Sequence, residues 1–214
     1  QYYLNQIGDA NRKKYLKLLG IHRKTKQPAG TLCRFRVTAD LTIPAGMKLF
    51  AGNICFETGA RRCLVQGDIA ACLWQGSSGE TEYVDREQLR FGHHIACYPF
   101  GLNPGRGDAF YMVFDRPLPV EERIRIYVQI YQDYPVRRTP VGEGMNPVLA
   151  DISWEYFCSE GWRAAGLAAD GTYGLLQNDF LEFELKKPMA ETIVSKGPAF
   201  CIRGRILKAE YDIP

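Results

Sequence analysis

The sequence predicts a mainly β protein: an antiparallel, jelly-roll-like β-sandwich, with a smaller β-rich domain and one short N-terminal helix. Three observations lead to this prediction. Residues 154–188 alternate at both ends around a Gly/Asp-rich middle, residues 123–131 alternate throughout, and short apolar segments recur along the chain with turn residues between them. Alternation buries one face of a strand and leaves the other in solvent, so several such segments joined by turns indicate antiparallel sheets.

The composition is typical of a globular protein. The 214 residues, 46% of them hydrophobic, suffice for one large β domain or two small ones. A net charge of +3, spread along the chain, is too small to indicate binding to nucleic acid or to a membrane. The sequence has no run of about 18 apolar residues that could span a bilayer. Because it starts at Gln1 without a Met and ends just after a strand-like run, we expect it to be a piece of a longer protein.

Residues 10–21 predict a short amphipathic helix with a basic outer face, because leucines and a tyrosine lie among basic residues and Gly20 follows as a helix stop. Such a helix either packs on its own domain or docks on a partner. The basic positions that we expect to contact a partner here are Arg12, Lys13 and Lys17.

The smaller β-rich domain is expected in residues 31–92. Cys33, Phe35 and Val37 alternate with polar residues, and Ile43–Gly46 (Ile-Pro-Ala-Gly) predicts a tight turn. Further strands are predicted at 47–50, 54–58 and 63–73, followed by a Gly/Ser-rich loop at 75–82 and a charged connector at 83–92. We place a domain boundary near His93, which gives domains 1–92 and 93–214.

The sandwich is expected in residues 93–214. Strands are predicted at 110–115, 123–131 and 200–211, and long loops at 133–147 and 190–198. Exposed charge and loops favour docking, so Arg137 and Arg138 in the first of these loops are the other expected partner contacts. Between the strands of 154–188, Asp170–Leu175 should form a surface turn, with Trp154 and Phe183 buried.

No catalytic or metal site is predicted. His93, His94 and Cys97 have the only metal-like spacing, but zinc usually needs four ligands. A nucleophilic enzyme is also disfavoured, because the chain has three histidines and no G-x-S-x-G motif. Glu182 and Glu184 could belong to a glycosidase pair, but their alternation with apolar residues favours the solvent face of a strand. Residues 101–107 (GLNPGRG) lack the GK[ST] ending of a phosphate loop.

The seven cysteines are an odd number and form no CxxC motif, so we expect free, buried thiols in a reducing compartment. The aromatic residues Trp154, Tyr156, Trp162 and Tyr173 leave two interpretations open. They either pack in the core or stack on a carbohydrate from an exposed face, and their exposure distinguishes the two.

Two stretches resemble known proteins when they are taken together. In residues 18–59, a Leu-Leu-Gly-Ile turn leads to a Pro-Ala entry, an Ile-Pro-Ala-Gly turn and a Phe-Glu-Thr strand, as in the amino-terminal part of baseplate J-like proteins. Residues 98–118 (YPFGLNPGRGDAFYMVFDRPL) and the motifs WEYFCSEGW, DGTYGL, FLEF and FCIRGRI in 154–206 are similar to baseplate assembly proteins of contractile phage tails and phage-derived contractile injection systems. The chain departs from the family pattern at Phe200-Cys201, where the family usually has Trp, and in its many cysteines.

The resemblance covers nearly the whole chain and implies a structural role. It implies a baseplate subunit without catalysis, cofactor or small-molecule substrate, assembled in the bacterial cytoplasm with copies of itself and other tail subunits. The alternative from the residues alone is a carbohydrate-binding β-sandwich module of a larger protein.

Overall fold

The structure, a computed structural model, confirms a mainly β fold in which all strand pairs are antiparallel. It describes residues 8–20, 28–33, 35–90, 98–130, 150–194 and 197–209. The chain divides into two units, Gln1–Phe35 and Arg36–Pro214. The first contains helix α1 (Asp9–Leu18), and the second contains helix α2 (Arg86–Arg90) and every strand that the structure describes.

Most of the described strands are short, and two of them are clearly longer than the rest. In chain order they are β1 (Leu41–Ile43), β2 (Lys48–Ala51), β3 (Ile54–Glu57), β4 (Arg62–Leu64), β5 (Ile69–Gln75), β6 (Thr81–Asp85), β7 (Ala109–Phe114), β8 (Arg123–Val128), β9 (Ala150–Cys158), β10 (Gly161–Ala164), β11 (Leu167–Asp170), β12 (Asp179–Glu184), β13 (Thr192–Val194) and β14 (Gly197–Ala209).

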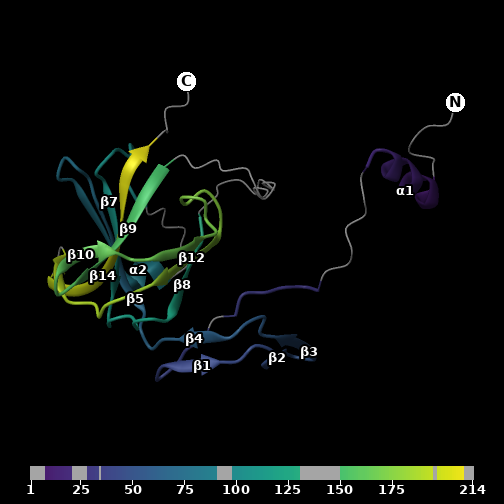
Figure 1. Ribbon diagram of the computed structural model, residues 1–214, viewed down its shortest axis with the longest axis horizontal. Coiled ribbons are helices and arrows are strands. Elements are labelled where there is room, and N and C mark those ends of the chain that lie inside the picture. Colours follow the sequence, from purple (N-terminus) through teal and green to yellow (C-terminus); the bar gives the residue numbers. More distant parts are fainter. Residues whose placement is uncertain are drawn as a thin grey trace. The chain divides into compact units, whose positions relative to one another are not determined.

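Two sheets form the sandwich (Figure 1). The larger has seven strands in the order β10-β9-β14-β7-β5-β6, with β13 paired to β14, and the smaller has the order β11-β12-β8. The larger sheet crosses the boundary that the sequence suggested near residue 93, because β5 and β6 precede that point and β7, which pairs with β5, follows it. The division into two compact units falls after residue 35.

The main core lies between these sheets and follows the predicted alternation. In β9, Trp154, Tyr156 and Cys158 are buried, and across from them Leu181 and Phe183 of β12 are buried too. The Trp154 and Phe183 rings meet edge to face, with centroids 5.5 Å apart. The predicted burial of Trp154 and Phe183 is therefore confirmed, and the contact joins the two layers directly.

The predicted turn after β11 is present, but it is only partly at the surface. Residues 171–178 connect β11 to β12, and the Asp170 carboxylate accepts hydrogen bonds from the Thr172 amide, the Thr172 hydroxyl and the Gly174 amide. Thr172 itself is fully buried, and Leu175 packs against the core. The side chains of the turn thus hold it against the core.

The outer face of the larger sheet carries a second, smaller apolar cluster. Leu73 of β5, Tyr111 and Val113 of β7 and Cys201 of β14 are buried there. Val194 of β13, which pairs with the start of β14, belongs to the same cluster. The larger sheet therefore carries buried apolar side chains on both of its faces.

A two-stranded ribbon precedes the sandwich. At its base β1 pairs with β4, and further along β2 pairs with β3 (Figure 1). Thr58 joins the two ladders: its hydroxyl donates to the Pro44 carbonyl and accepts from the Met47 amide. The predicted Ile43–Gly46 turn occurs, with φ of 75° at Gly46. It lies between β1 and β2 on one side of the ribbon, and these two strands do not pair with each other.

Three sequence expectations about local structure are wrong. The loop predicted at 190–198 contains strand β13 and the start of β14, which pair with each other. The alternating residues Cys33, Phe35 and Val37 form no strand in the part of the chain that is described, because they pair with no neighbour and lie at or near the surface. The charged connector predicted at 83–92 instead contains the second half of β6 and helix α2. The Asp85 carboxylate caps this helix by accepting a hydrogen bond from the Gln88 amide.

Candidate interaction surfaces

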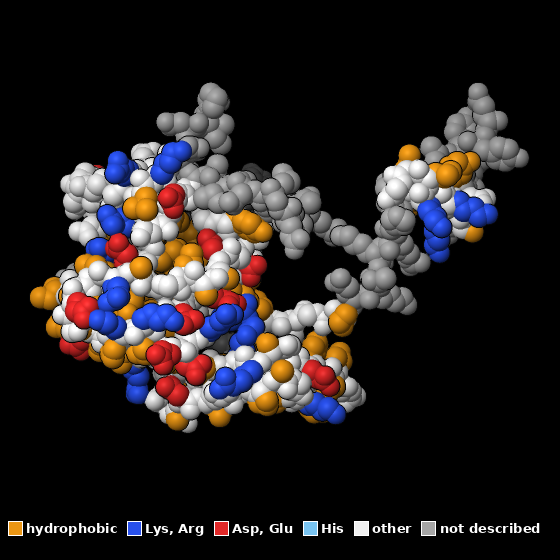
Figure 2. Space-filling model, viewed as in Figure 1, with side chains coloured by type: hydrophobic (Ala, Val, Ile, Leu, Met, Phe, Trp, Pro, Cys, Tyr) orange, Lys and Arg blue, Asp and Glu red, His pale blue; other side chains and the backbone are white. Residues whose placement is uncertain are grey.

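Helix α1 exposes both its basic and its apolar side chains. The three predicted contact residues of the helix are exposed, as the sequence predicted: Arg12, Lys13 and Lys17. Lys17 lies in the last turn, where a positive charge interacts favourably with the helix dipole. Figure 2 shows basic and hydrophobic side chains gathered on different sides of this helix. Leu18 and Leu19 are 82% and 74% exposed, respectively. An apolar side of this kind can pack on the helix's own domain or dock on a partner, and both alternatives stay open.

The other predicted contacts, Arg137 and Arg138, lie outside the described residues, as does the loop that contains them. The structure therefore brings together three of the five predicted contact residues on one helix and leaves the remaining two as predictions from the sequence.

The tip of the ribbon is an apolar surface that the sequence analysis did not single out. Phe50 is 71% exposed and Ile54 is 62% exposed, and they flank the Gly52-Asn53 turn. Phe50 lies directly opposite Cys55, whereas Ile54 lies opposite Ala51. Neighbouring positions on a strand point to opposite faces, so Phe50 and Ile54 project from the two sides of the ribbon. Figure 2 shows hydrophobic side chains at the surface of this region.

A charged cluster crosses the outer face of the larger sheet. Glu155 of β9 lies opposite Arg203 of β14, whose Nε donates to Glu155 Oε2 at 2.7 Å, and Arg205 Nη2 donates to Glu155 Oε1 at 3.0 Å. Burial by itself would raise the pKa of Glu155, but the hydrogen bonds from Arg203 and Arg205 outweigh it and lower that pKa. The Arg203 guanidinium also lies 3.7 Å from the centre of the Trp162 ring.

The two tryptophans of residues 154–188 do not form a sugar-stacking platform. Trp154 is 5% exposed in the core. Trp162 is half-buried, with Arg203 on one ring face and the edges of Tyr111 and Phe157 against it at centroid distances of 6.0 and 5.4 Å. Tyr156 is fully buried, and its hydroxyl accepts a hydrogen bond from the Lys187 amide. These contacts match core packing, which was the competing interpretation.

The candidate chemical motifs form no reactive site in the described part of the chain. Glu182 pairs with Arg125 at 2.7 Å and Glu184 pairs with Lys186, both on the outward side of β12, as the alternation predicted. Residues 101–107 form turns that lead into strand β7 and not into a helix. No group of three His, Cys, Asp or Glu side chains within the described ranges is arranged to hold a metal ion, and His93, His94 and Cys97 lie outside those ranges.

The cysteines differ in burial, where the sequence predicted buried thiols throughout, and Cys63 lies between the two extremes. Six are described and all are free. Cys72, Cys158 and Cys201 are buried as expected, whereas Cys33 and Cys55 are exposed. Burial raises the pKa of the Cys201 thiol to about 12. The expectation of buried thiols is therefore correct for the sandwich and wrong for the ribbon and for the segment that precedes it.

The sequence did contain a signal for the ribbon tip. A Gly-Asn pair between two apolar strands is a typical hairpin turn, and its flanking residues are then placed at an exposed end. No comparable signal exists for the Glu155–Arg203–Arg205 cluster, because the register between β9 and β14 cannot be read from either strand alone.

Within the described residues, no helix has the length and apolar character needed to cross a membrane. No model of a known protein family matches the chain, and no curated protein matches it significantly.

Proposed function

We propose that this chain is a non-enzymatic structural subunit, or part of one, of a contractile-tail or injection-system baseplate, where it mediates protein–protein assembly. The order of motifs along residues 18–59 and 98–206 supports the assignment to baseplate proteins. The structural observation that best supports an assembly role is the exposed apolar tip of the β2–β3 ribbon.

The physical argument concerns the stability of the ribbon. A two-stranded hairpin is marginally stable in water unless a third strand or a packed face supports it. The described residues provide β2 and β3 with no third strand, and the tip is apolar on both sides. Full burial of a Phe or Ile side chain is worth about 1.5–3 kcal/mol, so a partner that enclosed Phe50 and Ile54 would order the ribbon and gain affinity.

Helix α1 offers a second docking element of a different kind. Its exposed leucines supply apolar area, and Lys13 and Lys17 add charge that would favour an acidic partner surface. We expect other baseplate or tail subunits, and copies of this chain, to be the partners. Assembly would take place in the bacterial cytoplasm, before the particle is completed.

The carbohydrate-binding alternative is the weaker candidate. It requires Trp154 or Trp162 to present a free ring face on a concave surface, whereas Trp154 is in the core and Arg203 covers a face of Trp162. No glycan contact is therefore assigned to these two rings.

The test is to replace Phe50 and Ile54 together by Ser in the intact protein of the producing bacterium. Complete particles are then counted by negative-stain electron microscopy. We expect at least a tenfold loss of complete particles, because both apolar contacts of the tip would be removed. The matched control is Ile193→Ser, since Ile193 is 81% exposed on β13, outside the ribbon. A normal particle count for the double variant, with the protein present at its usual level, would contradict an assembly role for the ribbon.

A further inference from the structure

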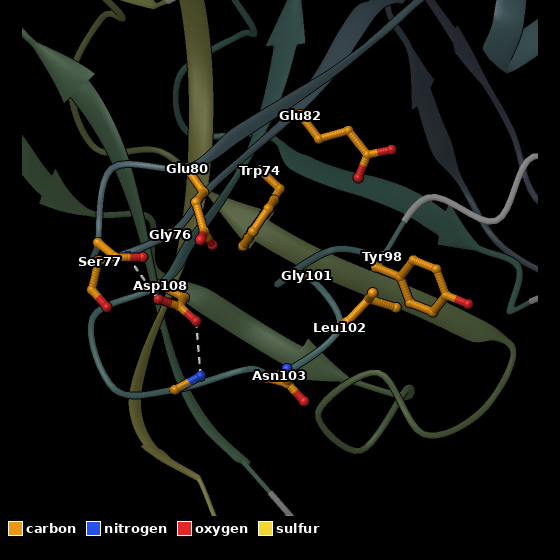
Figure 3. A pocket seen from close by; sticks show the side chains of 12 residues that line it. Trp74, Gly76, Ser77, Glu80, Glu82, Tyr98, Gly101, Leu102, Asn103 and Asp108 are labelled. Carbon is orange, nitrogen blue, oxygen red and sulfur yellow. Dashed lines mark hydrogen bonds between the residues drawn. The ribbon is translucent and has the colours of Figure 1, made fainter.

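A cavity of about 670 Å³ lies between the β5–β6 turn and the segment of residues 98–108 (Figure 3). Trp74 stands at the end of β5, Glu80 and Glu82 come from the turn and from β6, and Tyr98 and Leu102 approach from the other side. None of these residues belongs to the surfaces proposed above for assembly.

The absence of a side chain at Gly101 allows the Trp74 ring to pack directly against the backbone. A Cβ built on Gly101 would lie 2.3 Å from Trp74 Cζ2, and Gly101 has a φ of 74° that favours glycine. The indole therefore rests directly against the backbone of the 98–108 segment. Its position is fixed by the fold before any ligand arrives, which lowers the entropy cost of binding.

Two carboxylates border this ring. Glu82 lies directly opposite Trp74 in the β5–β6 ladder, so the two side chains share one face of the sheet. A Cβ built on Gly76 would lie 3.2 Å from Trp74 Cζ2 and 3.6 Å from Glu80 Oε2, so this carboxylate and the ring edge border the same point. Figure 3 shows the Glu80 and Trp74 side chains next to each other among the residues that line the cavity.

The charge of the cavity has one sign. Its lining contains Glu80, Glu82 and Asp108, and among the described residues that line it none is Lys, Arg or His. Asp108 is buried and accepts hydrogen bonds from the Ser77 and Gly105 amides, both at 2.8 Å, which tie the two loops together. Glu80 and Glu82 are exposed and keep acceptor oxygens for a ligand. Such a cavity repels anions and attracts a cation.

We propose that this cavity binds an arginine side chain presented by another protein chain. The guanidinium would stack at the Trp74 ring and donate hydrogen bonds to the carboxylates of Glu80 and Glu82. Arginine fits better than lysine, because its planar, weakly hydrated group stacks on aromatic rings and donates to carboxylates in pairs. A metal ion fits less well, because the described residues contain no cluster of ligands for one.

This site would add a specific contact to the assembly proposed above, and it rests on that proposal only for its partner. Its chemistry can be measured on the isolated chain. If the cavity does not bind arginine, the particle count of the Phe50 and Ile54 variant is unaffected. If that variant assembles normally, the cavity can still bind an arginine peptide.

The test is a titration of the ¹⁵N-labelled 214-residue chain with the peptide acetyl-Gly-Arg-Gly-amide, followed by NMR. The chain has three tryptophans, so it gives at most three indole N–H signals. Trp154→Phe and Trp162→Phe variants assign the Trp74 signal by elimination, without a change in the cavity. We expect the Trp74 signal to shift and to saturate at millimolar peptide.

Three comparisons make the titration specific. The same peptide with citrulline, a neutral analogue of arginine, should bind at least tenfold more weakly. Glu80→Gln and Glu82→Gln should each weaken arginine binding about threefold, the effect of losing an exposed ion pair, whereas Glu191→Gln, outside the cavity, should leave it unchanged. Equal binding of the citrulline peptide would overturn the proposal, and so would a stronger response to maltotriose, which would indicate a sugar site.

Discussion

Trp154 lies directly across the β9–β14 ladder from Gly204, and its ring occupies the space that a side chain at residue 204 would need. A Cβ built on Gly204 would lie 2.9 Å from Trp154 Cζ3 and 3.0 Å from the Ile152 methyl carbon. The ring cannot move aside easily, because its edge contact with Phe183 joins the two sheets. The glycine is thus part of the core packing.

Gly204→Ala should therefore destabilise the sandwich, although alanine usually stabilises a chain by restricting its unfolded state. We expect the free energy of unfolding to fall by about 1–2 kcal/mol because of overpacking. Guanidinium denaturation followed by tryptophan fluorescence measures it. Gly59→Ala is the control, since a Cβ there meets no atom within 4 Å. Equal stability of the two variants would show that the core has room beneath Trp154.

Glu155 should make the protein more sensitive to acid. Its pKa is lowered in the folded state, so its contribution to stability is present above the unfolded pKa, near 4.5, and is lost as the pH falls through the lower folded value. Glu155→Gln should cost about 1–2 kcal/mol of unfolding free energy at pH 7, because it removes hydrogen bonds to charged groups. It should also flatten the decline of stability below pH 4.5.

Urea denaturation of the wild type and of Glu155→Gln between pH 3 and pH 7 measures both effects. Glu160→Gln serves as the control, because Glu160 pairs with Lys187 and Arg163 in an exposed position. A decline below pH 4.5 as steep in Glu155→Gln as in the wild type would exclude Glu155 as a source of the acid sensitivity.

The cysteines should react in two groups. The thiolate is the reactive form, and burial raises the pKa of Cys201 to about 12, so Cys201 should resist alkylation at pH 8. Cys72 and Cys158 are buried as well, whereas Cys33 and Cys55 are exposed. A timed iodoacetamide reaction with mass spectrometry of each peptide should find Cys33 and Cys55 modified first and the buried three only after unfolding. Early modification of Cys201 would mean that the outer face of the sheet opens readily.

Particle assembly should depend on the positive charge of the predicted contact residues. Lys13→Glu with Lys17→Glu, and separately Arg137→Glu with Arg138→Glu, should each reduce the yield of complete particles several-fold, because reversed charges repel an acidic partner surface. Arg61→Glu with Arg106→Glu is the matched control, since both residues are exposed and neither was predicted to contact a partner. Particle counts that are unchanged in one double variant would remove that pair of residues from the proposed interface.

The sequence predicts the strands of the smaller sheet well, because a strand such as β12 has one buried and one more solvated face. The alternation of Leu181, Phe183 and Leu185 with Glu182 and Glu184 is the pattern that the structure shows. The same rule fails at Cys33–Val37, where alternation exists but the described residues contain no neighbouring strand to pair with. Alternation indicates that a segment can form a strand, and pairing decides whether it does.

The candidate surfaces are less predictable, because they depend on contacts between distant segments. Trp74, Glu82 and Gly101 meet only once β5, β6 and the 98–108 segment are in place. The larger sheet, whose strands lie on both sides of residue 93, is hard to predict for the same reason. Pairing of β5 with β7 across a gap of more than thirty residues leaves no local trace in the sequence.

The most direct test of the proposed function is to locate the chain in particles purified from the producing bacterium. An epitope tag inserted after Gly79, in the exposed β5–β6 turn, would be detected by immunogold electron microscopy. The account predicts gold label at the baseplate end of contractile tail-like particles. Purified particles that contain no tagged protein, while the protein is abundant elsewhere in the cell, would contradict it.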